Sequence, residues 1–180
     1  MGKVFDGIDS NLQCWIGAQP MFFVATAPLS GDGLVNLSPR GLDCLSVLDP
    51  YTLAWVDSTG SGIETIAHLR ENGRITLMWC AFSGPPRIVR VHGHGRVCLP
   101  GTPEYDDLLA RHPGQPSPRA VIVVVADRVS DSCGYGVPLM DKVGERDQMQ
   151  RWAQAKGPEG AASYRAERNV ASLDGLPGLS

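Results

Sequence analysis

The chain has 180 residues, of which 43% are apolar and 19% charged, and its formal net charge at pH 7 is −3. A chain of this length and apolar content can bury one hydrophobic core, so we expect a single domain over residues 1–180. The small, mixed charge gives no electrostatic basis for binding nucleic acid or an anionic membrane surface, and no apolar run is long enough to span a bilayer.

Short strands dominate the first part of the chain. Met21–Ala27 is a continuous apolar run, and Leu34–Leu37 follows it after the turn Ser30–Gly33, so the two segments predict a β-hairpin. We expect Ser38–Gly41 to close this hairpin. Tyr51–Asp57 predicts the next strand, with apolar residues on both of its faces.

The segment after this strand predicts a loop followed by a capped helix. Ser61 and Glu64 have the spacing of a capping box, which indicates a helix that begins at Ser61 and ends at Asn72–Gly73. Backbone N–H groups in the first turn, together with the glycines and hydroxyls of the loop, favour a phosphate-sized anion there. The alternative is an ordinary surface helix that binds nothing, and the spacing matches neither a Walker loop nor a dinucleotide fingerprint.

Three more strands are predicted further along. Arg74–Phe82 is apolar on both faces, as expected of a central strand, and Arg87–Leu99 alternates strictly between apolar and polar residues. Gly93 and Gly95 lie on the apolar face of the second of these strands and predict tight curvature or close backbone approach. Ala120–Ala126 is another continuous apolar strand.

Helices are fewer and short. Thr102 and Pro103 have the pattern of an N-cap and a first helical residue, and they predict a helix through Leu109. Asp147–Ala155 and Pro158–Val170 predict two more helices. About six short strands with single helices inserted indicate a mainly β protein, a small antiparallel barrel with peripheral α-helices.

The cysteines and the N-terminus favour a cytoplasmic protein. The five cysteines are odd in number and form no C-x-x-C pair, which argues against a disulfide framework. We expect reduced thiols that pack as small side chains. The first residues lack the charged-then-apolar layout of a secretory signal.

Several polar residues are candidates for a site. Ser38–Gly41 combines a hydroxyl, a rigid proline, a guanidinium and a glycine, a set suited to a planar polar ring or a phosphate, although an ordinary turn would use the same residues. His92 and His94 project the same way from one strand, but no further ligand is evident, so we expect a polar stripe and no metal site. Tyr135 either reaches a pocket or marks the exit from the barrel, and Cys133 has no activating neighbour in sequence.

Five segments together resemble the pyridoxamine 5′-phosphate oxidase-like family of split β-barrel flavoproteins, over about Trp15 to Val129. They are Phe22–Ala27, Val35–Gly41, Thr59–Thr65, Asn72–Met78 and Gly84–Gly93. The segments Gly134–Pro138 and Leu173–Leu179 resemble an uncharacterised bacterial branch of that family. The resemblance implies a six-stranded antiparallel split β-barrel of the FMN-binding type. It also implies a homodimer with two FMN molecules in clefts between the subunits.

The resemblance further implies a cofactor-binding role for particular residues. It places the isoalloxazine ring along Ser38, Pro39, Arg40 and Gly41. It places the phosphate at Ser58, Ser61, Gly62 and Thr65, where the helix start independently favours an anion. It adds the two arginines of the family's R-x-V-R-x-x-G strand, Arg87 and Arg90. It assigns no catalytic residue.

The chain departs from true pyridoxamine phosphate oxidases at three places. It has Gly62–Ile63 where those enzymes carry an Arg–Lys pair, it has Ile88 where they have a glutamine, and it lacks their C-terminal tryptophan-and-arginine motif. These departures argue against vitamin B6 oxidation. They also predict a weaker, reversible grip on the phosphate through hydroxyls, backbone amides and Arg40.

The sequence thus predicts a cytoplasmic, homodimeric, FMN-dependent oxidoreductase that acts on a small molecule. One alternative is a member of the same fold that binds the deazaflavin F420, or one that binds or degrades haem with His92 or His94 as the iron ligand. Another is a flavin or pyridoxal phosphate carrier without turnover. No pattern in the sequence identifies the substrate or the electron donor.

Overall fold

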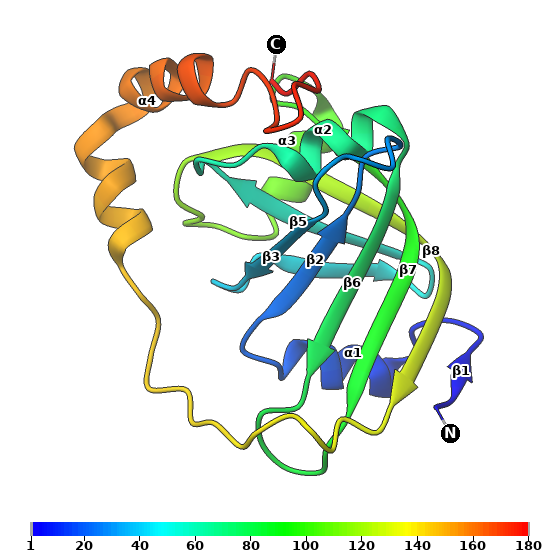
Figure 1. Ribbon diagram of the computed structural model, residues 1–180. Coiled ribbons are helices and arrows are strands. Elements are labelled where there is room, and N and C mark those ends of the chain that lie inside the picture. Colours follow the sequence, from blue (N-terminus) through cyan, green and yellow to red (C-terminus); the bar gives the residue numbers. More distant parts are fainter. Residues whose placement is uncertain (1, 180) are drawn as a thin grey trace.

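The computed structural model describes residues 2–179, and within them it has four α-helices and one antiparallel sheet of eight strands (Figure 1). The strands are β1 (Val4–Phe5), β2 (Phe22–Thr26), β3 (Asn36–Arg40), β4 (Leu45–Asp49), β5 (Thr52–Ser58), β6 (Arg74–Cys80), β7 (Ile88–Cys98) and β8 (Pro118–Ser132). The helices are α1 (Ser10–Gly17), α2 (Glu64–Glu71), α3 (Pro103–Leu109) and α4 (Gln148–Arg168). None of these helices is both long enough and apolar enough to cross a membrane.

The strands follow the order β3-β2-β6-β7-β8-β5-β4, and β1 adds to β8. Every pairing is antiparallel, and the long strand β8 pairs with both β7 and β5, so the sheet coils into an open, split barrel whose free ends are β3 and β4 (Figure 1). The expected mainly β, antiparallel fold is confirmed. The sheet has more than the expected six strands because β1 is only two residues long and β4 is half-buried from Leu45 to Leu48, without the alternation that reveals a strand.

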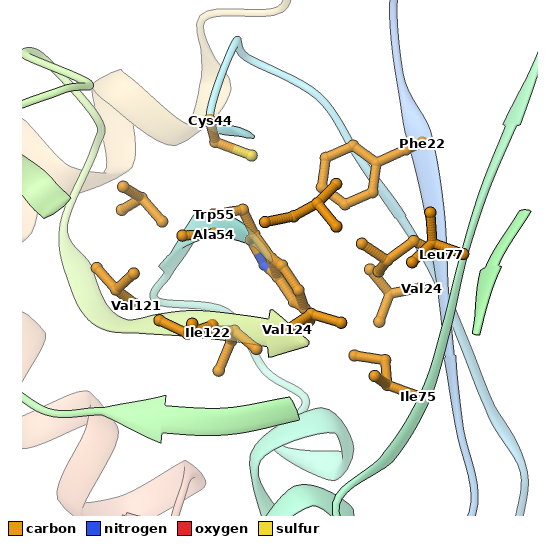
Figure 2. Close-up of a cluster of buried hydrophobic side chains, with 14 of the residues drawn as sticks. Phe22, Val24, Cys44, Ala54, Trp55, Ile75, Leu77, Val121, Ile122 and Val124 are labelled. Carbon is orange, nitrogen blue, oxygen red and sulfur yellow. The ribbon is translucent and has the colours of Figure 1, made fainter. Parts of the chain in front are cut away.

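The core fills the inside of this coiled sheet. Figure 2 shows side chains from β2, β5, β6 and β8 pointing toward one another around Trp55, which is 1% exposed. The Phe22 ring packs edge-on against Trp55, with 5.9 Å between ring centroids, and it stacks on Trp79 at 5.6 Å. Ile66 and Leu69 add the buried face of α2 to the same cluster. The helix therefore packs on the core through one apolar face.

The glycines of β7 have the role that the alternation predicts. A Cβ atom on Gly93 would lie 2.0 Å from the carbonyl oxygen of Val125, beside a bulge in the β7–β8 pairing, and one on Gly95 would lie 2.8 Å from Leu69. Gly93 thus lets β8 cross β7 closely, and Gly95 lets α2 lie against the sheet. Close backbone approach is confirmed at Gly93, whereas at Gly95 the close neighbour is a side chain.

Two predicted helical regions are confirmed and one helix was not predicted. The Thr102 side chain accepts a hydrogen bond from Tyr105 N at the start of α3, and Gly157, with a φ of 63°, divides the α4 region at the expected place before Pro158. Helix α1 escaped prediction because it has eight residues and buries only two of them.

The end of the first hairpin differs from the prediction. Ser38–Arg40 does not close the hairpin but forms the second half of β3, paired with Phe22–Val24 of β2. The proline is tolerated because β3 is at the edge of the sheet, where one row of N–H groups needs no partner. Because side chains alternate along a strand, Ser38 and Arg40 lie on the same face of β3.

Replacing Gly93 by alanine tests the close approach of β7 and β8. We expect Gly93→Ala to lower the free energy of unfolding by about 1–3 kcal/mol, because the added methyl group meets backbone that must move. Gly136→Ala is the matched control, since a Cβ there meets nothing within 4 Å. Urea titration measures both variants, and equal stability of the two would contradict this packing.

Candidate functional site

A buried ion pair joins the end of β5 to the start of β8. Asp57, at the end of β5, is 1% exposed, and its Oδ2 accepts a hydrogen bond from Arg119 Nε of β8 at 2.8 Å. Arg40 Nη2 of β3 lies 3.2 Å from the other carboxylate oxygen. Charges buried to this extent need partners, so the three side chains are held together by their mutual charge.

Arg119 also orders the loop that follows β5. Its Nη1 donates to Gly60 O at 3.2 Å and to Asn169 Oδ1 at 2.8 Å, and Asn169 Nδ2 donates to the same Gly60 oxygen at 2.9 Å. Thr59 Oγ1 in turn donates to Ser117 O at 2.9 Å. The loop is therefore fixed by residues that are far apart in the chain.

This anchoring changes where α2 begins. The helix starts at Glu64 rather than at Ser61, with Ile63 at the N-cap position and no side-chain cap, so the predicted capping box is wrong. A Glu64 carboxylate oxygen accepts instead from Leu173 N of the C-terminal tail at 3.3 Å. Tertiary contacts thus override the local capping preference and leave the first-turn N–H groups of α2 without a side-chain partner.

The loop, the start of α2 and strand β3 enclose a cavity of about 450 Å³, which we call the inner pocket. It brings together residues from four separate segments of the chain, and Arg119 forms part of its wall. Its lining is Asn36, Ser38, Pro39, Arg40, Ser58, Thr59, Gly60, Ser61, Gly62, Glu64, Thr65, Arg119 and Met149. The volume is in the range of small-molecule sites.

Asn36 sets the hydrogen-bonding polarity of the inner pocket. Its Nδ2 donates to Thr65 Oγ1 at 3.1 Å and to Thr26 Oγ1 at 3.0 Å, and its Oδ1 accepts from Ser38 Oγ at 2.8 Å. The Ser38 hydroxyl donates its only hydrogen to Asn36, so it can only accept a hydrogen bond from a ligand. The Thr65 hydroxyl accepts from Asn36, so its own hydrogen is available to donate to a ligand. An anion is favoured at the Thr65 end and a donor group at the Ser38 end.

A second cavity of about 590 Å³, the outer pocket, adjoins the inner one, and Pro39, Arg40 and Met149 line both. One wall is formed by residues 39–42, at the end of β3 and just after it. The other wall belongs to residues 139–147, the strap, which leads from β8 to α4 around the outside of the sheet (Figure 1). Its remaining lining is Pro20, Met21, Gly41, Leu42, Lys142, Gly144, Glu145, Arg146 and Gln148.

The wall of the outer pocket at Leu42 is held in a costly conformation. Leu42 and Asp43 have φ angles of 64° and 48°, in the left-handed region that branched and bulky residues avoid. Gln115 Nε2 donates to Leu42 O at 2.5 Å, and His112 Nδ1 lies 2.7 Å from Asp43 O. These two contacts from the loop at residues 112–117 therefore hold the strained backbone of Leu42 and Asp43 in place.

The structure brings together most of the residues predicted for cofactor binding. Those that line the inner pocket are Ser38, Pro39, Arg40, Ser58, Ser61, Gly62 and Thr65. Gly41 lines the outer pocket. The binding role of each of them stays a prediction, but their proximity follows from the fold.

The other two predicted residues, Arg87 and Arg90, lie where β7 begins and β8 ends and line neither pocket. Arg87 donates to Asp131 Oδ2 and lies over the rings of Phe5 and Trp15, while Arg90 Nη1 donates to Ser132 Oγ at 3.0 Å. Their role in binding stays a prediction.

The remaining candidates lie outside the two pockets. His92 and His94 are exposed, and Nδ1 of His94 pairs with Asp127 Oδ2 at 2.8 Å. Tyr135 is 82% exposed, so it marks the exit from the sheet rather than a pocket wall. Cys133 is exposed as well. Among the buried thiols, burial raises the pKa of Cys44 to about 12, which excludes a reactive thiolate there.

Sequence reasoning missed Arg119 and Asn36. Arg119 precedes a run of apolar residues and looks like a charged strand end, and only the pairing of β5 with β8 brings it to Asp57. A signal did exist for Asn36, because a polar residue interrupts the apolar segment of the first hairpin one position before Leu37. Its alternation with Ser38 puts both side chains on one face.

Comparisons with known proteins agree on the family and the fold. A protein-family profile described as "Pyridoxamine 5'-phosphate oxidase" matches residues 8–133. The pyridoxamine 5′-phosphate oxidase family protein ustO of Aspergillus flavus is 40% identical over 193 residues, which cover 97% of this chain and 77% of that protein.

Solved structures show the same fold at low sequence identity. HupZ of Group A Streptococcus superposes with a TM-score of 0.56 at 20% identity, over 68% of this chain and 91% of that one. Protein Rv2991 of Mycobacterium tuberculosis gives a TM-score of 0.50 at 16% identity, over 76% and 92% of the two chains.

Removing the buried carboxylate tests the ion-pair network. We expect Asp57→Asn to lower the free energy of unfolding by about 3 kcal/mol, because it leaves Arg119 buried without its counter-charge. Asp127→Asn removes an exposed carboxylate beside His94 and should cost less than about 1 kcal/mol. Thermal or urea unfolding compares the two, and a small, equal effect would show that the network is not needed.

Proposed function

The chain belongs to the pyridoxamine 5′-phosphate oxidase family, and we propose that it is an oxidoreductase that binds FMN in the inner pocket and acts on a small molecule. One observation carries the proposal. The hydroxyls of Ser58, Ser61 and Thr65 line a single pocket together with Ser38 and Arg40 of the hairpin. Such a pocket suits a ligand with an anion at one end and a polar ring system at the other.

The phosphate would bind at the start of α2. The helix has no side-chain cap, so its first N–H groups are available to an anion, and the Thr65 hydroxyl has its hydrogen to donate. Arg40 Nε is buried without a hydrogen-bond partner beside this site. These are orphaned donors, and a phosphate is the kind of group that satisfies them.

The rest of the cofactor would extend along β3 toward the outer pocket. Ser38 would accept a hydrogen bond from a hydroxyl or ring N–H group, because its own hydrogen is held by Asn36. Pro39 and Met149 offer apolar contact where the two pockets meet and exclude water there. Bound FMN supplies hydride-transfer chemistry, and the protein's task is to bind and orient it.

The geometry favours a flavin over haem. The lining residues of the two pockets, within residues 2–179, include no histidine, and the proposed iron ligands His92 and His94 lie on the exposed face of β7. Iron in a haem protein needs such an axial ligand. FMN therefore fits the donors present, and F420 stays the alternative that the titration below can exclude.

We also propose that two copies of the chain form a homodimer. One group of exposed apolar side chains lies on the hairpin of β2 and β3. They are Leu29, Leu34, Val35 and Leu37, each more than half exposed. Strand β3 is also a free edge of the sheet, which a second copy would cover.

Comparing FMN with riboflavin tests the phosphate site. We expect the wild-type protein to prefer FMN, and Thr65→Val to weaken FMN about tenfold while leaving riboflavin, which has no phosphate, nearly unchanged. Titration followed by quenching of flavin fluorescence measures both affinities. Thr76→Val, which removes a hydroxyl from β6 outside both pockets, is the control.

The same titrations can overturn the proposal. Equal affinity of the wild-type protein for FMN and riboflavin would place the phosphate elsewhere, and tight binding of F420 without binding of FMN would replace the cofactor. A protein purified with a Soret band would favour haem instead.

Light scattering tests the homodimer. We expect a dimer at micromolar concentration with FMN present, and we expect Leu37→Glu to shift it to monomer because a charge cannot be buried unpaired at an interface. Tyr135→Glu changes another exposed apolar side chain and should leave the dimer intact. A monomeric wild-type protein would contradict the assembly.

A further inference from the structure

The outer pocket has a chemical character different from that of the inner one. Its floor and walls are apolar where they meet the barrel, with Pro20, Met21 and Leu42 on one side and Met149 at the junction of the two pockets. Apart from Arg40, its charged lining residues, Lys142, Glu145 and Arg146, belong to the strap. The strap is fixed at its start by a hydrogen bond from Met140 N to Phe82 O at 2.9 Å.

Among residues 2–179, one of the cations that line the outer pocket has no carboxylate partner. Arg40 faces the inner pocket and pairs with Asp57, and Lys142 pairs with Glu145 within the strap. Arg146, which is exposed, has no carboxylate within ion-pair distance among residues 2–179. Within the part of the chain that the structure describes, the pocket therefore combines apolar walls with one guanidinium, that of Arg146, which has no carboxylate partner.

A guanidinium binds planar anions through two parallel N–H groups, and carboxylate matches this geometry. The apolar walls would take up a hydrophobic body behind the charged group, as in most small-molecule sites. The clamped conformation of Leu42 and Asp43 shapes that apolar wall before any ligand arrives, which lowers the cost of ordering on binding.

We propose that the outer pocket is the substrate site of this protein, and that it takes a small, largely apolar monocarboxylate whose carboxylate binds Arg146. The inference rests on the proposed FMN site, because the shared residues Pro39, Arg40 and Met149 would then place this molecule next to the cofactor. It goes further in naming the class of the substrate and the residue that selects it.

Benzoate and its neutral isostere benzamide are suitable probes. We expect ligand-observed NMR titrations of the wild-type protein, with FMN at saturation and without it, to show about tenfold tighter binding of benzoate. Arg146→Gln should abolish this preference and leave benzamide unchanged. Arg168→Gln removes an exposed arginine from the far end of α4, with the same change in net charge, and should keep the preference.

The outcomes of these titrations distinguish a failure of the carboxylate site from a failure of the proposed FMN site. Equal binding of the two probes to the wild-type protein, an unchanged preference in Arg146→Gln or the same loss in Arg168→Gln would overturn the carboxylate site. Phenyl phosphate binding more tightly than benzoate would overturn the choice of carboxylate. Failure of FMN to bind would defeat the proposed function alone, because the titration without FMN still measures the preference for benzoate. Displacement of benzoate by FMN would show that both compete for one pocket and would also overturn the inference.

Discussion

The buried ion pair of Asp57 and Arg119 is the interaction on which the rest of the site depends. It joins the end of β5 to the start of β8, and its neighbour Arg40 brings in β3. Two charges this far from solvent add little net stability, but neither tolerates the loss of its partner. The pair therefore acts mainly by specifying one arrangement of three strands. Because Arg119 also binds Gly60 O, the same arrangement sets the course of the loop before α2.

The ion pair also balances the charges of the residues that line the inner pocket. Its two cations, Arg40 and Arg119, both face the Asp57 carboxylate, and Glu64 adds a second negative charge to the lining. The pocket therefore has little excess positive charge, and neutral donors, the helix N–H groups and the Thr65 hydroxyl, are left to bind an anion. A phosphate at the proposed site would be held by hydrogen bonding more than by net charge, as expected of a cofactor that exchanges with solution.

The two pockets are lined by different parts of the chain, the inner one by the barrel and the outer one partly by the strap. The inner pocket is built from strands, the start of α2 and a loop that Arg119 and Asn169 hold by hydrogen bonds, whereas half of the outer pocket belongs to the exposed strap. Binding sites vary most readily where loops line them, because loop residues can change without disturbing a core. Members of one family can therefore share a cofactor site and differ in substrate, and Arg146 lies in the part of this chain where such a difference would arise.

The sequence by itself determined the antiparallel strands and the close approach at Gly93, because alternation and turn chemistry are local properties. The family resemblance indicated most of the residues that gather at the inner pocket, but not Asn36 or Arg119. The sequence pattern misplaced the start of α2, since Ser61 and Glu64 satisfy a capping box only when nothing else competes for them. Only the tertiary structure decided that Arg119 meets Asp57 across paired strands, and that Arg146 of the strap lines the same pocket as Leu42. Those contacts join residues far apart in the chain, and no local pattern encodes which distant charge a folded chain will bring to its partner.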